Sequence, residues 1–222
     1  MIQSTTFDFL KNLKKNNNKE WFDRNRESYD KAKQNFLDFT ETLIDGISEF
    51  DESIYHAHLD AKSCVSRINR DIRFSKDKTP YKSNFFAIIN QGGKKSPLAG
   101  YYFQLEPNES FLGGGVYMSE SSVLQKIRKE IDYHFDDFQG IVESNDFMQV
   151  FKDGVKSSSV LARPPKGYEA DSPAIEYLKR KDFYTLKYLT DKDLQNQKNI
   201  SIILESFFAV KPLINFINSA FK

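Results

Sequence analysis

The residues best suited to chemistry gather in one stretch, Arg67–Ser83, which reads RINRDIRFSKDKTPYKS. Its cations are Arg67, Arg70, Arg73, Lys76, Lys78 and Lys82, its acids are Asp71 and Asp77, and its aromatic residues are Phe74 and Tyr81. Guanidinium and ammonium groups donate charge-assisted hydrogen bonds to phosphates and carboxylates. The stretch therefore predicts an anion-binding site made by the six cations, with Tyr81 and Phe74 able to stack on a base or a sugar.

The backbone conformation of this stretch decides which cations share a surface. In an extended chain Arg67, Asp71 and Arg73 share one side, whereas in a helix Arg67, Arg70 and Asp71 align. In both forms Asp71 can orient a guanidinium through paired hydrogen bonds. The alternative to a ligand site is a solvated basic loop whose Arg–Asp pair only fastens two elements. Exposed ion pairs contribute about 0–1 kcal/mol each, so stability alone poorly explains six cations.

Candidates for further roles are few. Arg163 and Lys166, from the second half of the chain, could complete the anion site. Asp71 is the one catalytic candidate, as a base or orienter beside a phosphate, although aspartates among arginines are normally ionised salt-bridge partners. The chain has no P-loop and no dinucleotide-binding glycine motif, so it identifies no cofactor. His56–His58 is better explained as a polar connection than as a pair of ligands, and no metal site is predicted.

The charge balance restricts the classes of partner. The chain has 32 lysines and arginines against 31 aspartates and glutamates, a net charge of +1, which favours neither nucleic acid nor a membrane surface. Between Ala61 and Lys95, however, nine basic residues accompany two acidic ones. Such a local excess can focus positive potential at one surface. We expect a phosphorylated small molecule as the ligand, with nucleic acid as a less favoured alternative.

The compartment is predicted from what the sequence lacks. The single cysteine, Cys64, excludes an internal disulfide and a cysteine-based zinc site. The N-terminus does not show the basic-then-apolar order of a signal peptide. No apolar run approaches the roughly 20 residues that span a bilayer. We therefore expect a cytoplasmic protein without a membrane partner.

Hydrophobic periodicity predicts the elements that must position the basic stretch. Apolar residues from Trp21 to Phe50 recur at helical spacing after a candidate N-cap, Asn18, which predicts one long helix. Strands are predicted over residues 64–68, 84–90, 100–106, 111–118 and 183–189, and the third and fourth of these should pair as a hairpin. Pro212 predicts a kink or a second helix within the last helical region. The glycines at 113–115 are explained by a bulge, by close approach of another backbone, or by room for a ligand.

These elements predict an α+β fold in which a single antiparallel, or mixed, sheet packs against several helices. One domain should cover residues 1–222. It would comprise an N-terminal helical segment over about 5–50, a sheet core over about 63–118, and helices with a further strand over about 120–220.

The basic stretch also resembles the hallmark of a known family, the domain-of-unknown-function family numbered 2461. Similar features flank it along nearly the whole chain: Trp21-Phe22 with Tyr29, Gly100–Phe103, Gly115–Met118, Ile127-Arg128, Pro165–Tyr168 and Leu178-Lys179. The resemblance implies membership of a family found in bacteria and fungi. It assigns no activity, cofactor or catalytic residue.

Three hypotheses about function follow. The first is a domain that binds a phosphorylated or nucleotide-like ligand at Arg67–Ser83. The second is an enzyme acting on a phosphorylated or carboxylated metabolite, with arginine clamps and Asp71 as base or orienter. The third is a scaffold that uses its aromatic helices to bind another protein.

Overall fold

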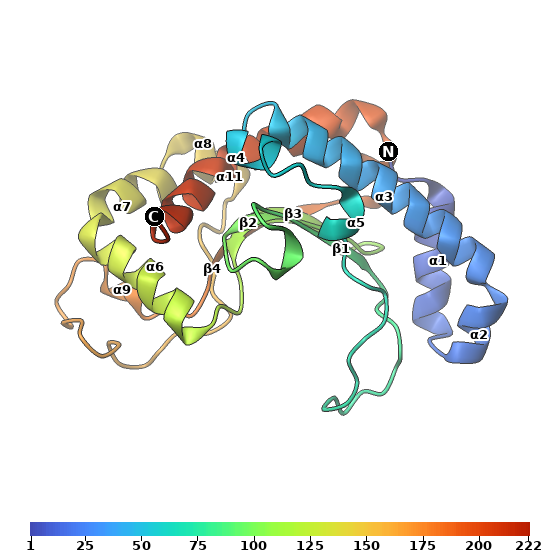
Figure 1. Ribbon diagram of the computed structural model, residues 1–222, viewed down its shortest axis with the longest axis horizontal. Coiled ribbons are helices and arrows are strands. Elements are labelled where there is room, and N and C mark those ends of the chain that lie inside the picture. Colours follow the sequence, from blue (N-terminus) through green and yellow to red (C-terminus); the bar gives the residue numbers. More distant parts are fainter.

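The computed structural model describes the backbone of residues 1–222 and every side chain except that of Lys95. Four antiparallel strands form one sheet in the order β1-β2-β3-β4, and helices cover one of its faces (Figure 1). This arrangement confirms the predicted α+β fold with a single antiparallel sheet. The strands are β1 (Phe85–Ile89), β2 (Gly100–Leu105), β3 (Ser110–Val116) and β4 (Phe183–Leu189).

The helices occupy the N-terminal segment, the long connection from β3 to β4, and the C-terminal end. They are α1 (Ser4–Lys15), α2 (Lys19–Arg24), α3 (Arg26–Ser48), α4 (Glu52–Tyr55), α5 (Ala61–Cys64), α6 (Ser121–Tyr133), α7 (Phe135–Val142), α8 (Asn145–Val150), α9 (Ile175–Leu178), α10 (Asp191–Gln195) and α11 (Ile200–Ser219). Two short 3₁₀ turns cover Gly93–Lys95 and Gln197–Asn199.

Side-chain alternation gives the sheet one sealed face. The odd-numbered residues of β2 are almost fully buried. The ring of Phe103 in this set lies 6.1 Å from the ring of Phe36 and 5.1 Å from that of Phe39, both on α3. Because alternate residues of a strand point to opposite faces, Tyr102 and Gln104 point away from these helices.

Helix α11 closes the sealed face over β3. A Cβ atom added at Gly114 would lie 3.0 Å from side-chain atoms of both Val210 and Ile214, so the helix packs directly on the strand. The segment Gln197–Ser219 is long and apolar enough to cross a bilayer by length and composition alone, which the sequence analysis did not foresee. In this fold the buried side of α11 contributes to the core through Phe207, Val210, Leu213, Ile214 and Ile217.

The predicted long helix is two helices in the structure. Asn18 is its N-cap as expected, because its Oδ1 accepts a hydrogen bond from the amide of Trp21 at 2.9 Å. The backbone then leaves helical geometry at Asn25, with φ −107° and ψ 23°, and α3 begins at the next residue. The side-chain amide of Asn25 donates to the carbonyl of Trp21 at 2.8 Å, so it competes locally with the helical hydrogen-bond pattern.

Two other predicted elements also differ. The segment predicted as a strand over residues 64–68 begins at the end of α5 and makes a single isolated bridge, between Val65 and Ala87. Its pairing is interrupted, so it does not become a full strand. At the C-terminal end, Pro212 lies within α11, which continues as one helix rather than dividing into two.

The glycine run in β3 is explained by close approach of neighbouring backbone and of a helix. A Cβ atom at Gly113 would overlap the carbonyl oxygen of Thr185 in β4, and one at Gly115 would overlap that of Phe183. Gly115 also has φ +121°, a conformation that side chains disfavour. Because these positions have no side chain, neighbouring atoms approach the backbone at the centre of the sheet closely.

We expect Gly113→Ala to destabilise the protein by about 2–3 kcal/mol, because the β3–β4 pair must separate to admit the methyl group. Gly140 in α7 is a matched control, since no atom lies within 4 Å of its added Cβ. Gly140→Ala should stabilise by about 0.5–1 kcal/mol through helix propensity. Urea unfolding measures both changes. Equal free energies for the two variants would contradict this account of the glycine run.

Candidate functional site

The basic stretch forms an arm, residues 67–83, that projects from the sheet beside β1 (Figure 1). Its two limbs run antiparallel at the base. Asn69 bridges Tyr81, and the amide of Lys82 donates to the carbonyl of Ile68 at 2.8 Å. The limbs are therefore extended at the base, while the outer part of the arm is neither strand nor helix. Neither of the two uniform conformations considered from the sequence runs through the whole stretch.

The side chain of Arg70 makes hydrogen bonds within the arm. Its Nη1 donates to the carboxylate of Asp77 and to the hydroxyl of Thr79, and it reaches the carbonyl of Thr79 at 3.2 Å. Asp77 in turn accepts from the amide of Thr79 at 2.9 Å, which closes a turn at the outer end. The pKa of Asp77 is lowered by the Thr79 amide first and then by the Arg70 guanidinium. Arg70 therefore fixes the shape of the arm.

Arg73 and Lys78 are also engaged locally. Arg73 donates to both oxygens of Asp71, at 3.0 and 2.7 Å. These hydrogen bonds and that of the Arg73 amide lower the pKa of the Asp71 carboxyl. Lys78 Nζ donates to the carbonyl of Ile72 at 2.9 Å. Asp71 is thus an exposed, ionised partner of Arg73, and this environment does not raise its basicity.

Tyr81 anchors the arm to the N-terminal helices. Its ring is only 7 % exposed and stacks on Phe22 of α2 with 4.0 Å between ring centroids. The side chain of Asn17 holds the backbone of Tyr81 from both sides: it donates to the carbonyl at 2.8 Å and accepts from the amide at 3.1 Å. The Tyr81 ring is therefore not available for stacking on a ligand. Phe74, by contrast, is 93 % exposed near the far end.

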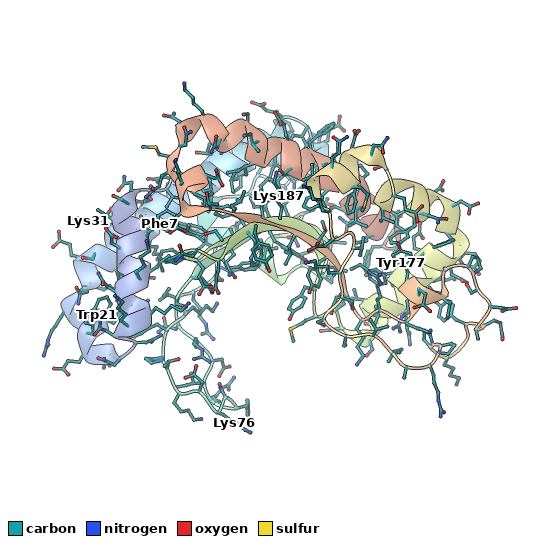
Figure 2. All side chains as sticks on the ribbon, turned by 180° about the vertical axis from the view of Figure 1, so that it is seen from behind. Phe7, Trp21, Lys31, Lys76, Tyr177 and Lys187 are labelled. Carbon is teal, nitrogen blue, oxygen red and sulfur yellow. The ribbon has the colours of Figure 1, made fainter. Side chains whose placement is uncertain are left out.

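Three predicted cations remain: Arg67, Lys76 and Lys82. Among the described residues, no hydrogen bond or ion pair engages Arg67 or Lys76. Lys76 lies at the far end of the arm, away from the sheet (Figure 2). Lys82 lies at the base, where its Nζ donates to the hydroxyl of Ser66 at 3.3 Å. Burial lowers the pKa of Lys82, and the charge of Arg67 lowers it further, so Arg67 lies within electrostatic range of Lys82 at the base.

The face of the sheet that the helices leave uncovered contains a hollow of about 540 Å³, and Lys82 lies at its edge. This volume is in the range of small-molecule sites. The hollow is mainly aromatic and apolar, with a few polar groups. Its walls are Lys82, Asn84, Phe86, Ile88, Tyr102, Gln104, Phe111, Tyr117, Tyr184 and Leu186.

Strand register explains how these residues meet. Tyr102 of β2 pairs with Gly113 of β3, which pairs with Leu186 of β4. The glycine places no side chain between Tyr102 and Leu186, and both of these side chains line the hollow. The hydroxyl of Tyr102 donates to the carbonyl of Gly115, and burial raises the pKa of this phenol. Tyr102 is therefore a fixed, neutral wall of the hollow.

A buried carboxylate fixes the polar side chains beside Lys82 through hydrogen bonds. Glu106 is 9 % exposed and accepts hydrogen bonds from Ser83 at 3.1 Å, Asn84 at 3.3 Å and Gln104 at 3.1 Å. Lys14 of α1 adds an ion pair at 3.4 Å. Four donors thus stabilise one anion, which fixes the amides of Asn84 and Gln104 at the edge of the hollow.

Sequence reasoning missed most walls of this hollow. Alternation in residues 100–106 separates Tyr102 and Gln104 from the buried residues, and this was the one available signal. It could not show that the face they occupy stays uncovered. Arg163 and Lys166 are exposed on the loop that leads to α9. In Figure 1 that loop lies on the side of α6 and α9, whereas the arm projects below β1, toward the side of α1, so the structure does not bring these cations to the arm.

A larger hollow, of about 690 Å³, lies among α1, α2 and α3. Its walls include Asp8, Asp38 and several neutral polar residues, with Lys31 as the cation. Asn35 on its wall is already engaged, because its Oδ1 accepts from the amide of Gln3 and the hydroxyl of Thr6 and its Nδ2 donates to the carbonyl of Met1. This hollow gathers no set of cations from the basic stretch, so the uncovered face of the sheet is the better candidate.

We expect Arg70→Lys to loosen the arm, because a lysine cannot reach Asp77, Thr79 and Ser75 together as the guanidinium does. Trypsin cleavage at the far end should become about tenfold faster, while the melting temperature stays within about 2 °C of wild type. Lys76→Arg, at an unengaged position that keeps a trypsin site, is the control and should cleave at the wild-type rate. Cleavage of Arg70→Lys at the control rate would exclude the bracing role.

The turn at Asp77 should depend on pH. Its pKa is lowered in the folded arm, so its stabilising effect is complete above the ordinary aspartate pKa of about 3.9 and is lost as pH falls through the lowered value. An NMR titration of the Thr79 amide should therefore show a midpoint below about 3.9. Asp77→Asn should abolish the transition. A wild-type midpoint at or above the ordinary value would disprove the assignment.

Comparison with known proteins identifies the family but no characterised relative. No curated protein and no solved structure matches the chain. One family model, described as a conserved hypothetical protein (DUF2461), matches residues 5–216, which include the arm, all four strands and the hollow. Since this match covers nearly the whole chain, the protein belongs to the DUF2461 family.

Proposed function

We propose that this protein binds an anionic small molecule, phosphorylated or nucleotide-like, in the hollow on the uncovered face of the sheet. Arg67 and Lys82 bind its charged group, and the aromatic walls receive the rest. The observation that carries the proposal is the position of Lys82, a cation that is half-buried at the edge of an aromatic hollow, next to a second cation, Arg67.

The electrostatics support this use of Lys82. Two cations placed together repel each other, and burial adds a desolvation cost to the charged ammonium. Both effects lower the pKa of Lys82. A bound anion would offset both costs, and at an effective dielectric constant of about 20 one ion pair at 4 Å is worth about 4 kcal/mol before desolvation. An anion at this position would therefore stabilise the charged form of Lys82.

The walls of the hollow support a ligand with a flat or apolar body. Tyr117 and Tyr184 contact each other edge to face with 5.4 Å between centroids, and Phe86 lies 6.1 Å from Tyr102. Aromatic faces stack on bases and other planar groups, with about 1–3 kcal/mol per stacked base. Tyr117 is 51 % exposed, so part of this aromatic surface is open to a ligand.

The alternative hypotheses draw less support. An enzyme that uses Asp71 as a base would need a carboxylate of raised pKa in a cleft, and Asp71 is exposed, ionised and paired with Arg73. A nucleic-acid surface would need cations free to contact successive phosphates, and Arg70, Arg73 and Lys78 are engaged inside the arm. A small anionic ligand needs only the pair at the base.

We expect Arg67→Ala and Lys82→Ala each to weaken binding of the probe 8-anilinonaphthalene-1-sulfonate, an aromatic anion, by about tenfold, the equivalent of roughly 1.4 kcal/mol. Fluorescence titration measures the dissociation constants. Lys76→Ala and Arg73→Ala remove similar charges away from the hollow and should bind as wild type does. The proposal fails if all four variants bind alike, or if excess inorganic pyrophosphate does not compete with the probe.

The affinity should also fall at alkaline pH. The anion requires protonated Lys82, and the pKa of Lys82 lies below that of an exposed lysine, so binding should weaken as pH rises through this lowered value. Lys82→Arg keeps its charge at every accessible pH and should abolish the decline. Parallel titrations of wild type and Lys82→Arg between pH 7 and about 10 measure the difference. Identical profiles would show that Lys82 does not hold the anion.

A further inference from the structure

The hollow does not end at the middle of the sheet. A second hollow, of about 230 Å³, shares three of its walls, Ile88, Tyr102 and Tyr117. It extends toward the 3₁₀ turn at Gly93–Lys95 and the segment that precedes α6. The two hollows are therefore neighbours on the uncovered face, and we treat them as one groove, with Lys82 lining the first hollow and Asn90 the second.

Asn90 presents an unused acceptor at this second end. The residue is 2 % exposed, and its Nδ2 donates to the carbonyl of Leu98 at 3.0 Å. A carbonyl oxygen only accepts, so this bond fixes which side of the amide carries Oδ1. Oδ1 is buried and has no hydrogen-bond partner among the described side chains and backbone. Buried acceptors in folded proteins are rarely left without a hydrogen-bond partner.

Ser119, which lines the same hollow, also has a buried polar atom without a hydrogen-bond partner among the described residues. Its Oγ is buried and, within the part of the chain that the structure describes, has no hydrogen-bond partner. The preceding residue, Met118, has φ +53°, and its amide donates to Asp182 Oδ1 at 2.6 Å, which fixes the backbone that presents Ser119. Two unsatisfied polar atoms on residues that line one hollow are an arrangement that a ligand hydrogen-bonding to both would complete.

We propose that Asn90 and Ser119 form a second subsite of the same groove, which accepts a hydrogen-bond donor of the ligand, such as an amino or amide N–H. This inference rests on the proposed function, because it assumes that the anionic group lies at Arg67 and Lys82. It specifies the chemical group at the end of the ligand opposite the anion. An uncharged donor suits an amide oxygen and a hydroxyl, whereas a second anion does not.

The spacing of the two ends sets an upper limit to the length of the ligand. Lys82 and Asn90 are eight residues apart, and the chain bends at Ser83 and Asn84 before β1 begins. At about 3.3 Å per extended residue their backbones are at most about 26 Å apart, and the bends and the lysine side chain shorten this gap. A dinucleotide can place a terminal phosphate at Lys82 and a base amino group at Asn90.

The test uses 5′-phosphorylated adenylyl-adenosine (pApA) as the probe, with inorganic pyrophosphate as a probe of the anionic end alone. Ser119→Ala should weaken pApA binding about five- to tenfold, the loss of one hydrogen bond, and leave pyrophosphate binding unchanged. Lys82→Ala should weaken both. An analogue of pApA whose second base is purine, which lacks the amino group, should bind wild type as weakly as pApA binds Ser119→Ala.

Stability separates a ligand subsite from a structural role. An unsatisfied buried hydroxyl contributes nothing to folding, so Ser119→Ala should leave the urea midpoint unchanged or raise it. A hydroxyl that bonds to ordered water within the fold would give a lower midpoint and unchanged pApA affinity, and that result would overturn the proposal. Asn90→Ala, which also loses its bond to Leu98, is a second variant. It should weaken pApA but not pyrophosphate, provided that its circular dichroism shows a folded protein.

The two proposals fail in distinguishable ways. If pyrophosphate binding does not respond to Lys82→Ala, the proposed function is wrong. If pyrophosphate responds but pApA binds no more tightly than pyrophosphate, the anionic site stands and the second subsite is rejected. If pApA binds more tightly and Ser119→Ala and Asn90→Ala have no effect, the extra affinity comes from the aromatic walls and the assignment of the donor subsite is rejected.

Discussion

The packing of β3 against two neighbours at once is the constraint on which the rest of the structure depends. Its central glycines let α11 lie directly on one face and let β4 approach closely along one edge. Any side chain at Gly114 would push Val210 and Ile214 outward and open the core. The helices can therefore seal only this face. The opposite face, with no helix packed over its centre, keeps its aromatic residues as the walls of a groove.

An uncovered aromatic sheet face is costly to leave in water unless something binds there. Soluble proteins rarely keep large contiguous apolar surfaces exposed without a functional reason. Here polar and charged side chains accompany the exposed rings. The groove is lined by the cation Lys82 at one end, by polar side chains that Glu106 fixes along its rim, and by residues with unsatisfied polar atoms at the other end. Apolar walls with a few fixed polar groups are the general form of a small-molecule site.

The outer part and the base of the basic stretch have different structural roles in this fold. Its outer cations, Arg70 and Arg73, neutralise acids of the same loop and hold the arm in one shape. Its base is clamped by Asn17 and by the stacking of Tyr81 on Phe22. A braced arm with a fixed base keeps Lys82 at the edge of the groove, and the proposed ligand would therefore meet a largely preorganised cation. The dense charge that suggested a broad electrostatic surface thus reduces to a pair of cations beside an aromatic groove.

The sequence by itself determined the α+β class, the four strands within a residue or two, the β2–β3 hairpin and the cap at Asn18, because these depend on local alternation, periodicity and turn chemistry. It also located the basic stretch and the family. Local signals could not show that Asn25 divides a helix, that the ring of Tyr81 is buried, or that Arg70 turns inward to Asp77.

Tertiary structure alone decided which face of the sheet is sealed, and so which of the alternating side chains line a site. Tyr102 and Gln104 alternate with Tyr101 and Phe103 in the sequence, but only the packing of α3 and α11 makes one set core and the other set the wall of a groove. The presence of Asn90 and Ser119 in the lining of one hollow depends on it as well. These residues are far apart in the chain, and they line the same hollow because the end of β1 and the segment before α6 both border it.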